Sequence, residues 1–330
     1  MTLLARYQTM LMARAIERRL WVLDHLDGLP PRRAGRWREA PVGTYAQRLG
    51  FEVVQVAAAA ALRPGHDWVV PCNKDLALCL AMGVSPLDVM LALFGRAADP
   101  ASGGRQAPGA LGSRHARIVM TSAAAGRHIV QAAGIAYASK VSGRDEVTLV
   151  CTDASGTAAG DWHEGVNFAG THFLPFICLV EDHADATRPI TQRAEGSPAA
   201  RAEGYGLTAE AIDGGDFAAA VAAFKRAVDR ARSKRGASLI HASVVDLTAK
   251  TAAGKRRPPE ELEALAAEDP IDRLRRRLLA QGILEEATDD HLQRECARVV
   301  AAAVEEARAA PSPDGPQALD NVFSRGEESG

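Results

Sequence analysis

Two loops of the sequence carry residues that suit the binding of a diphosphate and a divalent metal. The loop DASGTAAGD follows the apolar run at residues 147–152, and the loop EDHAD follows the apolar run at residues 176–180. Small residues let a backbone approach a phosphate closely, and the amino terminus of a following helix favours negative charge. A magnesium ion on such a diphosphate needs oxygen ligands, and Asp153 and Asp182 are the carboxylates available. Similar loops also occur in α/β proteins that bind no phosphate, so both interpretations stand at this point.

A βαβ unit is expected to position these two loops. Residues 147–152 and 176–180 are continuous apolar runs, which are typical of strands inside a parallel sheet. Between them, a helix is predicted from Asp161, with Glu164 three residues on as a capping pair, to about His172. Strands joined in this way form a right-handed crossover, and their carboxyl ends meet at the edge where open parallel sheets bind ligands.

The rest of the chain predicts an α/β fold, with a largely parallel sheet, helices on both faces and further helices toward the C-terminus. Two more strands are expected at residues 68–71 and 239–247. Helices are predicted up to Leu80 and at residues 2–28, 50–62, 86–95, 124–140, 216–233, 260–267, 270–281 and 288–309. We expect residues 1–330 to form one domain, with an N-terminal helix and loop in residues 1–50. Residues 248–330 would hold a late loop, C-terminal helices and a tail.

Composition argues against several classes of protein. Lysine and arginine total 39 and aspartate and glutamate total 41, so no basic surface for nucleic acid or an anionic membrane is expected. No run of about 18 apolar residues is present, which argues against a membrane span. The five cysteines form no CxxC pair and no zinc-type spacing with histidine, so we expect reduced, buried thiols in a cytoplasmic protein.

Three segments carry a resemblance to a known family. SAAAGRHIVQAAGIAYASK, GDWHEGVNFA and the apolar strand that ends in Glu-Asp-His resemble the thiamine-binding core of the alpha subunits of 2-oxo acid dehydrogenases, especially the branched-chain type. The segments YQTMLMARAIERRL, GFEVVQVAAAAALRPGHDWVVP and EDPIDRLRRRLLAQGIL resemble further parts of the same subunits. The resemblance therefore extends over nearly the whole chain.

The resemblance implies a thiamine diphosphate-binding fold and a role in 2-oxo acid decarboxylation. In the family, the alpha chain binds the diphosphate end of thiamine diphosphate with magnesium, and the beta subunit supplies a glutamate for the aminopyrimidine. Two alpha and two beta chains form a tetramer that decarboxylates a branched-chain 2-oxo acid and transfers the acyl group to lipoyl. The expected partners are thus a beta subunit and the lipoyl acyltransferase core, with neither nucleic acid nor membrane.

The family's cofactor-binding positions can be carried over because the framework between Ser122 and His183 matches without gaps. They fall on Asn73, Lys74, Ala123, Ala125, Asp153, Ala154, Ser155, Glu181, Asp182, His183 and Asp185. The acid of the family's metal-binding Gly-Asp-Gly turn falls on Ala154, beside Asp153, and the second asparagine of its Asn-Asn pair falls on His183. Asp153 and His183 are therefore the predicted metal ligands, although imidazole is a poor ligand for magnesium.

Other cofactor contacts of the family are replaced in this chain. Its Tyr-Arg pair falls on Asn73 and Lys74, which keeps a positive charge but loses the bidentate fork of arginine. Its Ser-Pro-Leu turn falls on residues 123–125, which are all alanine, and the adjacent threonine and glutamine fall on Arg127 and His128. The resemblance thus implies a weaker hold on the diphosphate.

The catalytic histidine of the family is also missing. Its His-His pair in the late loop falls on Ala249 and Lys250, so no catalytic residue is assigned. His241 belongs to the preceding strand, and we do not expect it to replace the lost histidine. Our hypothesis is an alpha-type subunit with a degenerate cofactor site and weak or lost catalysis. The alternative is a non-catalytic paralogue that serves as a scaffold, a regulator or a binder of another anion.

Overall fold

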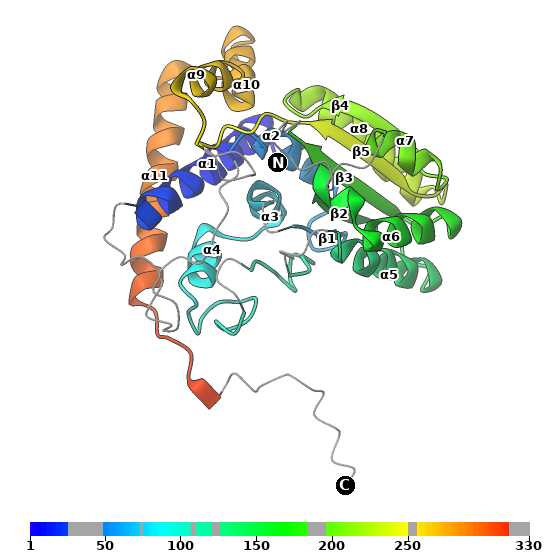
Figure 1. Cartoon of the computed structure of the whole chain (residues 1–330). Helices are drawn as coiled ribbons and strands as arrows, with labels where there is room; N and C mark the ends of the chain where they lie inside the picture. Colours follow the sequence, from blue (N-terminus) through cyan, green and yellow to red (C-terminus); the bar gives the residue numbers. More distant parts are fainter. Residues whose placement is uncertain are drawn as a thin grey trace.

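In the part of the chain that the structure describes, the sheet predicted from the apolar runs has five strands, and each paired strand in it runs parallel to its neighbour. In the computed structural model, the order is β1-β2-β3-β5-β4 (Figure 1). The strands are β1 (Trp68–Val70), β2 (Thr148–Asp153), β3 (Phe176–Asp182), β4 (Thr208–Asp213) and β5 (Ser238–Ser243). The structure describes residues 1–25, 49–72, 75–106, 110–120, 126–183, 196–249 and 256–316. The α/β class with a parallel sheet and C-terminal helices is confirmed.

Helices precede, connect and follow these strands. They are α1 (Leu3–His25), α2 (Glu52–Ala61), α3 (Leu76–Met82), α4 (Pro86–Leu93), α5 (His128–Val141), α6 (Gly160–Thr171), α7 (Pro198–Glu203), α8 (Phe217–Arg232), α9 (Pro259–Ala267), α10 (Pro270–Ala280) and α11 (Glu286–Ala309). A short 3-10 helix, η1 (Ala154–Ala158), lies between β2 and α6. Among these helices, none combines the length and the apolar character that crossing a bilayer requires.

The sequence-based predictions were wrong or incomplete at three elements. The capping pair Asp161–Glu164 does not form, because the N-cap of α6 is Ala159, which makes no side-chain capping bond. Asp161 lies instead in the first turn of α6, where its negative charge interacts favourably with the positive end of the helix dipole. Helix α7 and strand β4 were not predicted. The β4 sequence TAEAID is rich in residues with low strand propensity and occupies an exposed sheet edge.

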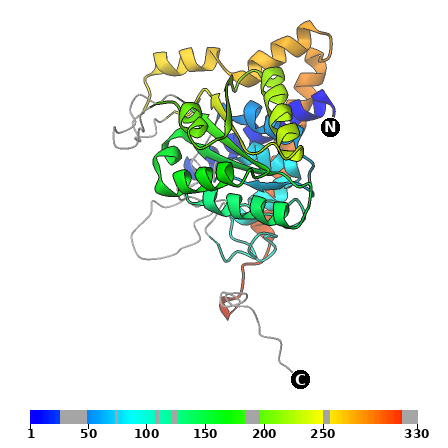
Figure 2. The ribbon, with the colours of Figure 1, turned by 90° about the vertical axis from the view of Figure 1, so that its right-hand side faces the viewer.

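The two faces of the sheet pack against different groups of helices. Leu149 and Cys151 of β2 belong to a large apolar cluster with α1, α2, α3, α4 and α8, whereas Val150 belongs to a smaller cluster with α5, α6 and α7. Successive side chains of a strand point to opposite faces, which explains the division. Figure 2 shows α5 and α6 side by side in front of the sheet.

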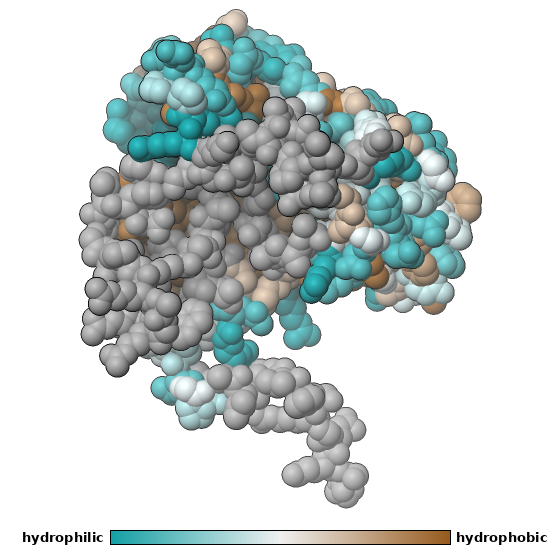
Figure 3. Space-filling view, in the orientation of Figure 1, coloured by the Kyte–Doolittle hydropathy of each residue, from teal (hydrophilic) through white to brown (hydrophobic). Residues whose placement is uncertain are grey.

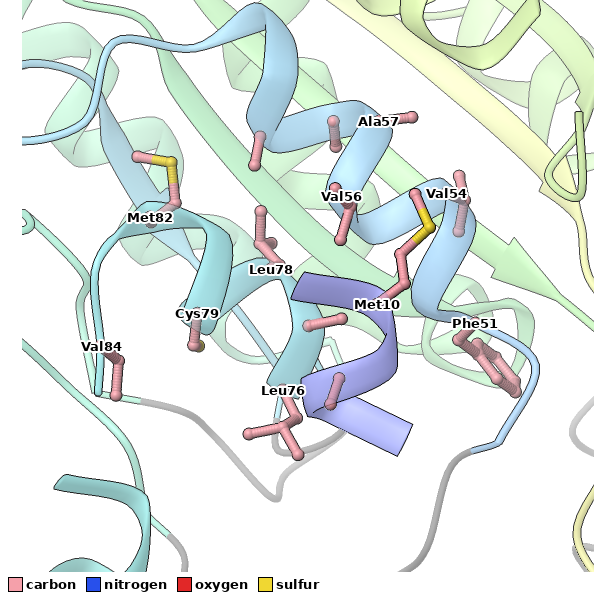
Figure 4. Close-up of a cluster of buried hydrophobic side chains, with 14 of the residues drawn as sticks. Met10, Phe51, Val54, Val56, Ala57, Leu76, Leu78, Cys79, Met82 and Val84 are labelled. Carbon is pink, nitrogen blue, oxygen red and sulfur yellow. The ribbon is translucent and has the colours of Figure 1, made fainter. Parts of the chain in front are cut away.

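The larger cluster joins the N-terminal helices to the sheet. Met10 of α1, Val56 of α2 and Leu78 of α3 are fully or almost fully buried and lie around one shared space in Figure 4. Burying an aliphatic side chain of this size stabilises a fold by about 1.5–3 kcal/mol. These contacts fix α2 and α3 against one face of the sheet, the face on which Glu181 contacts Gln55 of α2.

A buried ion-pair network connects α1 with the starts of α2 and α10. Both guanidinium edges of Arg14 are engaged, with Nε 2.5 Å from Glu52 Oε1 and Nη1 2.7 Å from Asp269 Oδ2. The backbone N–H of Gly50 also donates to Glu52, over 2.8 Å. The neighbouring carboxylates raise the pKa of Arg14 above its ordinary value despite the opposing effect of burial. Arg14 is therefore a charged tie between three distant segments.

All five cysteines are buried and free, as the sequence predicted. Cys79 lies in α3, Cys151 in β2, Cys178 in β3 and Cys296 in α11, while Cys72 follows β1. Burial raises the pKa of Cys178 to about 12 and that of Cys296 to about 11. Thiols with such pKa values stay protonated near neutral pH.

Candidate functional site at the carboxyl ends of the strands

The carboxyl ends of β2 and β3 lie side by side. The two strands pair in parallel along their length, and the last pair in register is Asp153 with Glu181. The prediction that the two loops meet at one edge of the sheet is therefore confirmed for the strand ends that carry them (Figure 1). We call Asp153–Thr157 and Glu181–His183 the two arms of the strand-end site.

Asp153 closes the first arm on itself. Its Oδ1 accepts a hydrogen bond from the backbone N–H of Gly156 at 2.9 Å and another from the Ser155 hydroxyl. The side chain thus serves as the N-cap of η1. This capping role accounts for an aspartate at this position without a metal.

Close backbone packing holds the same arm against the start of α5. A Cβ at Gly156 would lie 2.1 Å from Thr152 Oγ1, and a Cβ at Gly126 would lie 2.6 Å from Ala159 Cβ. Gly126 also has a φ of +78°, which favours glycine. The two glycines therefore let the turn before α5 approach η1 at the backbone level.

Ala154, which takes the position of the family's metal-binding acid, is part of the apolar packing. It is 9% exposed and belongs to the cluster formed with α5 and α6. Nothing in its methyl side chain can bind a cation. At this position the hydrophobic environment itself opposes a charge, because an unpaired carboxylate in apolar surroundings is strongly disfavoured.

Arg201 of α7 contacts the end of the first arm, which the sequence did not predict. Its guanidinium donates to the carbonyl oxygen and to the hydroxyl of Thr157, over 2.8 and 2.6 Å. It also lies over the Trp162 ring, 5.0 Å from the ring centroid. Burial lowers the pKa of Arg201. No sequence pattern indicated this contact, because α7 itself was not predicted.

Glu181 and Asp182 serve different faces of the sheet. Glu181 is 1% exposed and its Oε1 accepts from Gln55 Nε2 of α2 at 3.0 Å, on the side of the larger cluster. Asp182 Oδ2 lies 3.0 Å from His241 Nε2 of β5. The available carboxylate of the second arm is therefore engaged with His241, a residue of the neighbouring strand.

His183, the other predicted metal ligand, lies against an aromatic ring. Its ring centroid is 6.2 Å from that of Phe51, in an edge-on arrangement with an interplanar angle of 63°. Phe51 immediately precedes α2 and is buried. This contact gives the histidine a packing role.

Two buried residues beside Glu181 were missed as site residues. Asp75, just before α3, is 1% exposed, and its Oδ2 accepts from the backbone N–H of Cys72 at 2.7 Å. Gln55 Nε2 lies 3.4 Å from Asp75 Oδ1, so the amide links Asp75 to Glu181. A glutamine within the apolar helix sequence EVVQVAAAAA was the available signal, since a buried amide needs polar partners.

Several predicted positions lie outside the described residues. They are Asn73, Lys74, Ala123, Ala125, Asp185 and Lys250. Ala249, the position of the family histidine, is described, and its carbonyl oxygen accepts from the backbone N–H of Arg257 at 3.0 Å. A cavity of about 170 Å³ lies away from the strand-end site, between Met1 and Arg6 of the amino terminus and the end of α2.

Comparison with known proteins gives a consistent picture. The sequence model of a family described as "Dehydrogenase E1 component" matches residues 33–315. The 2-oxoisovalerate dehydrogenase subunit alpha of Bacillus subtilis (strain 168) is 34% identical over 324 residues, which cover 97% of this chain and 94% of that protein. The 3-methyl-2-oxobutanoate dehydrogenase subunit alpha of Mycobacterium tuberculosis is 31% identical over 260 residues, covering 77% and 68%. The pyruvate dehydrogenase E1 component subunit alpha of Acholeplasma laidlawii is 29% identical over 300 residues, covering 89% and 80%.

Proposed function

Because this chain belongs to the dehydrogenase E1 component family, with the plan of a branched-chain alpha subunit, we propose that it assembles as such a subunit with a degenerate cofactor site. The family implies thiamine diphosphate and a divalent metal as cofactors. The cofactor, when bound, supplies the carbanion chemistry that 2-oxo acid decarboxylation requires. In this chain, the groups that would anchor its diphosphate are changed.

The observation that carries the proposal is the apolar packing of Ala154. The position of the family's metal acid holds a methyl group that is buried with α5 and α6. The side chains of the other candidate ligands also have protein partners, because Asp153 caps η1 and Asp182 contacts His241. His183 packs on Phe51 and offers a nitrogen where magnesium prefers oxygen. This donor set does not fit a magnesium ion that bridges a diphosphate.

The second candidate is the non-catalytic paralogue, and the retained framework favours it. The tight contacts of Gly126 and Gly156 keep the first arm in place although the metal acid is gone. Arg201 adds a desolvated cation at the end of that arm. These features suit a chain whose fold and assembly matter more than turnover, or one that binds another anion.

We assign the exposed apolar surface of α5 and α6 to the beta subunit. Tyr137 of α5 is 42% exposed and Phe168 of α6 is 37% exposed, and their ring centroids are 5.6 Å apart. Val130 and Val141, also exposed, extend this surface along α5. Hydrophobic residues lie among hydrophilic ones at the right-hand side of Figure 3, where these helices lie. Exposed apolar groups of this kind mark interaction surfaces.

The experiment uses this chain assembled with its beta subunit. Thiamine diphosphate and magnesium should give no rise in melting temperature, and decarboxylation of a branched-chain 2-oxo acid should be about 10² to 10⁴ slower than in an intact family member. A ligand present at a hundred times its dissociation constant would stabilise the complex by about 2.7 kcal/mol. A shift of that size together with turnover at a normal rate would contradict the proposal.

A further inference from the structure

The cavity between the start of α1 and the end of α2 has room for a small molecule. Its volume is about 170 Å³. A dry apolar cavity of roughly 150 Å³ in another protein holds one benzene molecule, so this one can hold a ligand of about six to eight non-hydrogen atoms. Met1 and Pro64, which are both exposed, belong to the lining residues, so the cavity can be reached from the surface.

The wall on the side of α2 and α3 is aliphatic. Val56, Ala59 and Ala60 of α2 line it together with Leu62, which follows α2, and Ala81 of α3. None of these residues has a polar side chain. Val56 is 1% exposed and Leu62 is 8% exposed, so this wall continues into the large apolar cluster. An alkyl group that displaces water from such a wall gains free energy.

Arg6 brings a positive charge to the same cavity. Among the described lining residues, it alone has an ionisable side chain, and a guanidinium remains charged in proteins. No hydrogen bond or ion pair engages its guanidinium in the described part of the chain, whereas Arg14 of the same helix has two carboxylate partners. The first turn of α1 contains no acidic residue that could balance the charge. A carboxylate in the cavity would supply the partner that Arg6 lacks.

The two helix ends at the cavity favour one orientation of such a ligand. Helix α1 begins at Leu3, and α2 ends at Ala61. The start of a helix carries a partial positive charge and the end carries a partial negative charge. An anionic group is therefore favoured on the side of Arg6 and disfavoured on the side of α2, where the aliphatic wall lies. The ligand should be anionic at one end and apolar at the other.

The cavity is separate from the strand-end site. Gln55, near the start of α2, contacts Glu181 at the end of β3. The cavity lies at the other end of α2, from which the chain leads to the start of β1. The two sites thus share one helix but lie toward opposite ends of the sheet.

We propose that this cavity binds a short aliphatic monocarboxylate, of about four to six carbon atoms by its volume. The carboxylate would pair with the guanidinium of Arg6, and the alkyl group would lie against Val56 and Ala60. The proposal does not depend on whether thiamine diphosphate binds or whether the chain has catalytic activity.

The test is a titration of the full chain with 3-methylbutanoate, followed by NMR of its valine and leucine methyl groups. The methyl signals of Val56 and Leu62 should shift and saturate, with a dissociation constant on the order of 1 mM. From acetate to 3-methylbutanoate, affinity should rise roughly fourfold per added carbon, because each one buries more apolar surface. Arg6→Gln should weaken binding at least about tenfold, and Ala60→Leu should block it by filling the cavity.

Arg18→Gln is the matched control, because Arg18 is an exposed arginine of α1 that does not line the cavity. It should bind 3-methylbutanoate as the unchanged chain does, and all three variants should keep a cooperative unfolding transition. The uncharged analogue 3-methylbutan-1-ol should bind at least about tenfold more weakly than the acid. Equal binding of the alcohol, equal losses in Arg6→Gln and Arg18→Gln, or methyl signals that do not move would each overturn the proposal.

Discussion

Glu181 and Asp182 are neighbours in β3, yet their side chains lie on opposite faces of the sheet. Glu181 contacts Gln55 of α2, whereas Asp182 contacts His241 of β5. This alternation follows from the geometry of a strand. As a consequence, the two acids point to different faces, and only Asp182 lies on the face of the smaller cluster, in which Ala154 packs. Its Oδ2 is engaged with His241.

Restoring the family's metal groups should restore metal binding. We expect Ala154→Asp with His183→Asn to lower the melting temperature of the metal-free chain, since a carboxylate then enters apolar surroundings. Thiamine diphosphate with Mg²⁺ should recover that loss in the assembly with the beta subunit. Differential scanning calorimetry with and without the ligands measures both effects. Asp182→Asn alone is the control and should produce no ligand-dependent rise.

Arg14→Met should destabilise the chain strongly. The substitution leaves Glu52 and Asp269 buried without their shared cation, which typically costs about 3–5 kcal/mol. Denaturant unfolding measures the change in the free energy of unfolding. Arg226→Met is the comparison, because its pair with Glu210 is exposed and such pairs contribute about 0–1 kcal/mol. Equal losses in the two variants would disprove the special role of the Arg14 network.

Glu146 should contribute stability that acid removes. Burial raises the pKa of this carboxyl, but hydrogen bonds from Ser139, Arg117 and Trp68 lower it by more. The net effect is a pKa of about 2 instead of the ordinary 4.5. Because the folded pKa is depressed, the stabilisation is complete above pH 4.5 and is lost as the pH falls toward 2. Glu146→Gln should therefore reduce the free energy of unfolding at pH 7, by an amount on the order of 3 kcal/mol. Unfolding curves between pH 3 and 7 should show the gap narrowing with acid, and a constant gap would contradict the assignment.

Two helical glycines should respond in opposite ways to alanine. A Cβ at Gly165 of α6 would lie 2.8 Å from Ile129 Cγ2 and 2.9 Å from the Ile129 carbonyl carbon, so Gly165→Ala should push α5 and α6 apart and destabilise the chain. Gly134 of α5 has open space around it, and Gly134→Ala should stabilise by about 0.5–1 kcal/mol. Thermal unfolding of the isolated chain compares them, and a gain in both would mean that the helices are not closely packed.

The surface on α5 and α6 should be required for assembly and not for folding. The double variant Tyr137→Glu with Phe168→Glu replaces two exposed rings by charged side chains. Because both positions are exposed, the melting temperature of the isolated chain should change little. Co-purification with the beta subunit should be lost, as read by size-exclusion chromatography with light scattering. Lys225→Glu, at an exposed position on α8, serves as the charge control. Retained assembly in the double variant would assign the beta subunit to another surface.

Periodicity and loop chemistry were sufficient to predict much of this molecule. Continuous apolar runs gave β2 and β3 and the edge where they meet, because buried parallel strands have no alternation to obscure them. Strand β4 was not predicted, because an edge strand needs few apolar residues and its sequence TAEAID contains few. The cap of α6 was misassigned because η1 intervenes and ends the loop at Ala159.

The group of buried polar residues beside the strand-end site could not be predicted from the sequence. Gln55, Asp75 and Glu181 are separated by tens of residues, and no motif spacing connects them. By contrast, the placement of Glu181 and Asp182 on opposite faces could be predicted from the sequence. Successive side chains of a strand alternate between faces, so the prediction requires only that both residues belong to the strand.

The buried thiols make this chain its own reporter of opening. Burial raises the pKa of Cys178 to about 12 and that of Cys296 to about 11, so alkylating reagents find no thiolate while the fold stays closed. Modification must wait for a local or global opening. The rate of alkylation under native conditions, measured for each cysteine peptide, would then report how often the protein opens at β3 (Cys178) and at α11 (Cys296). No label has to be introduced for this measurement.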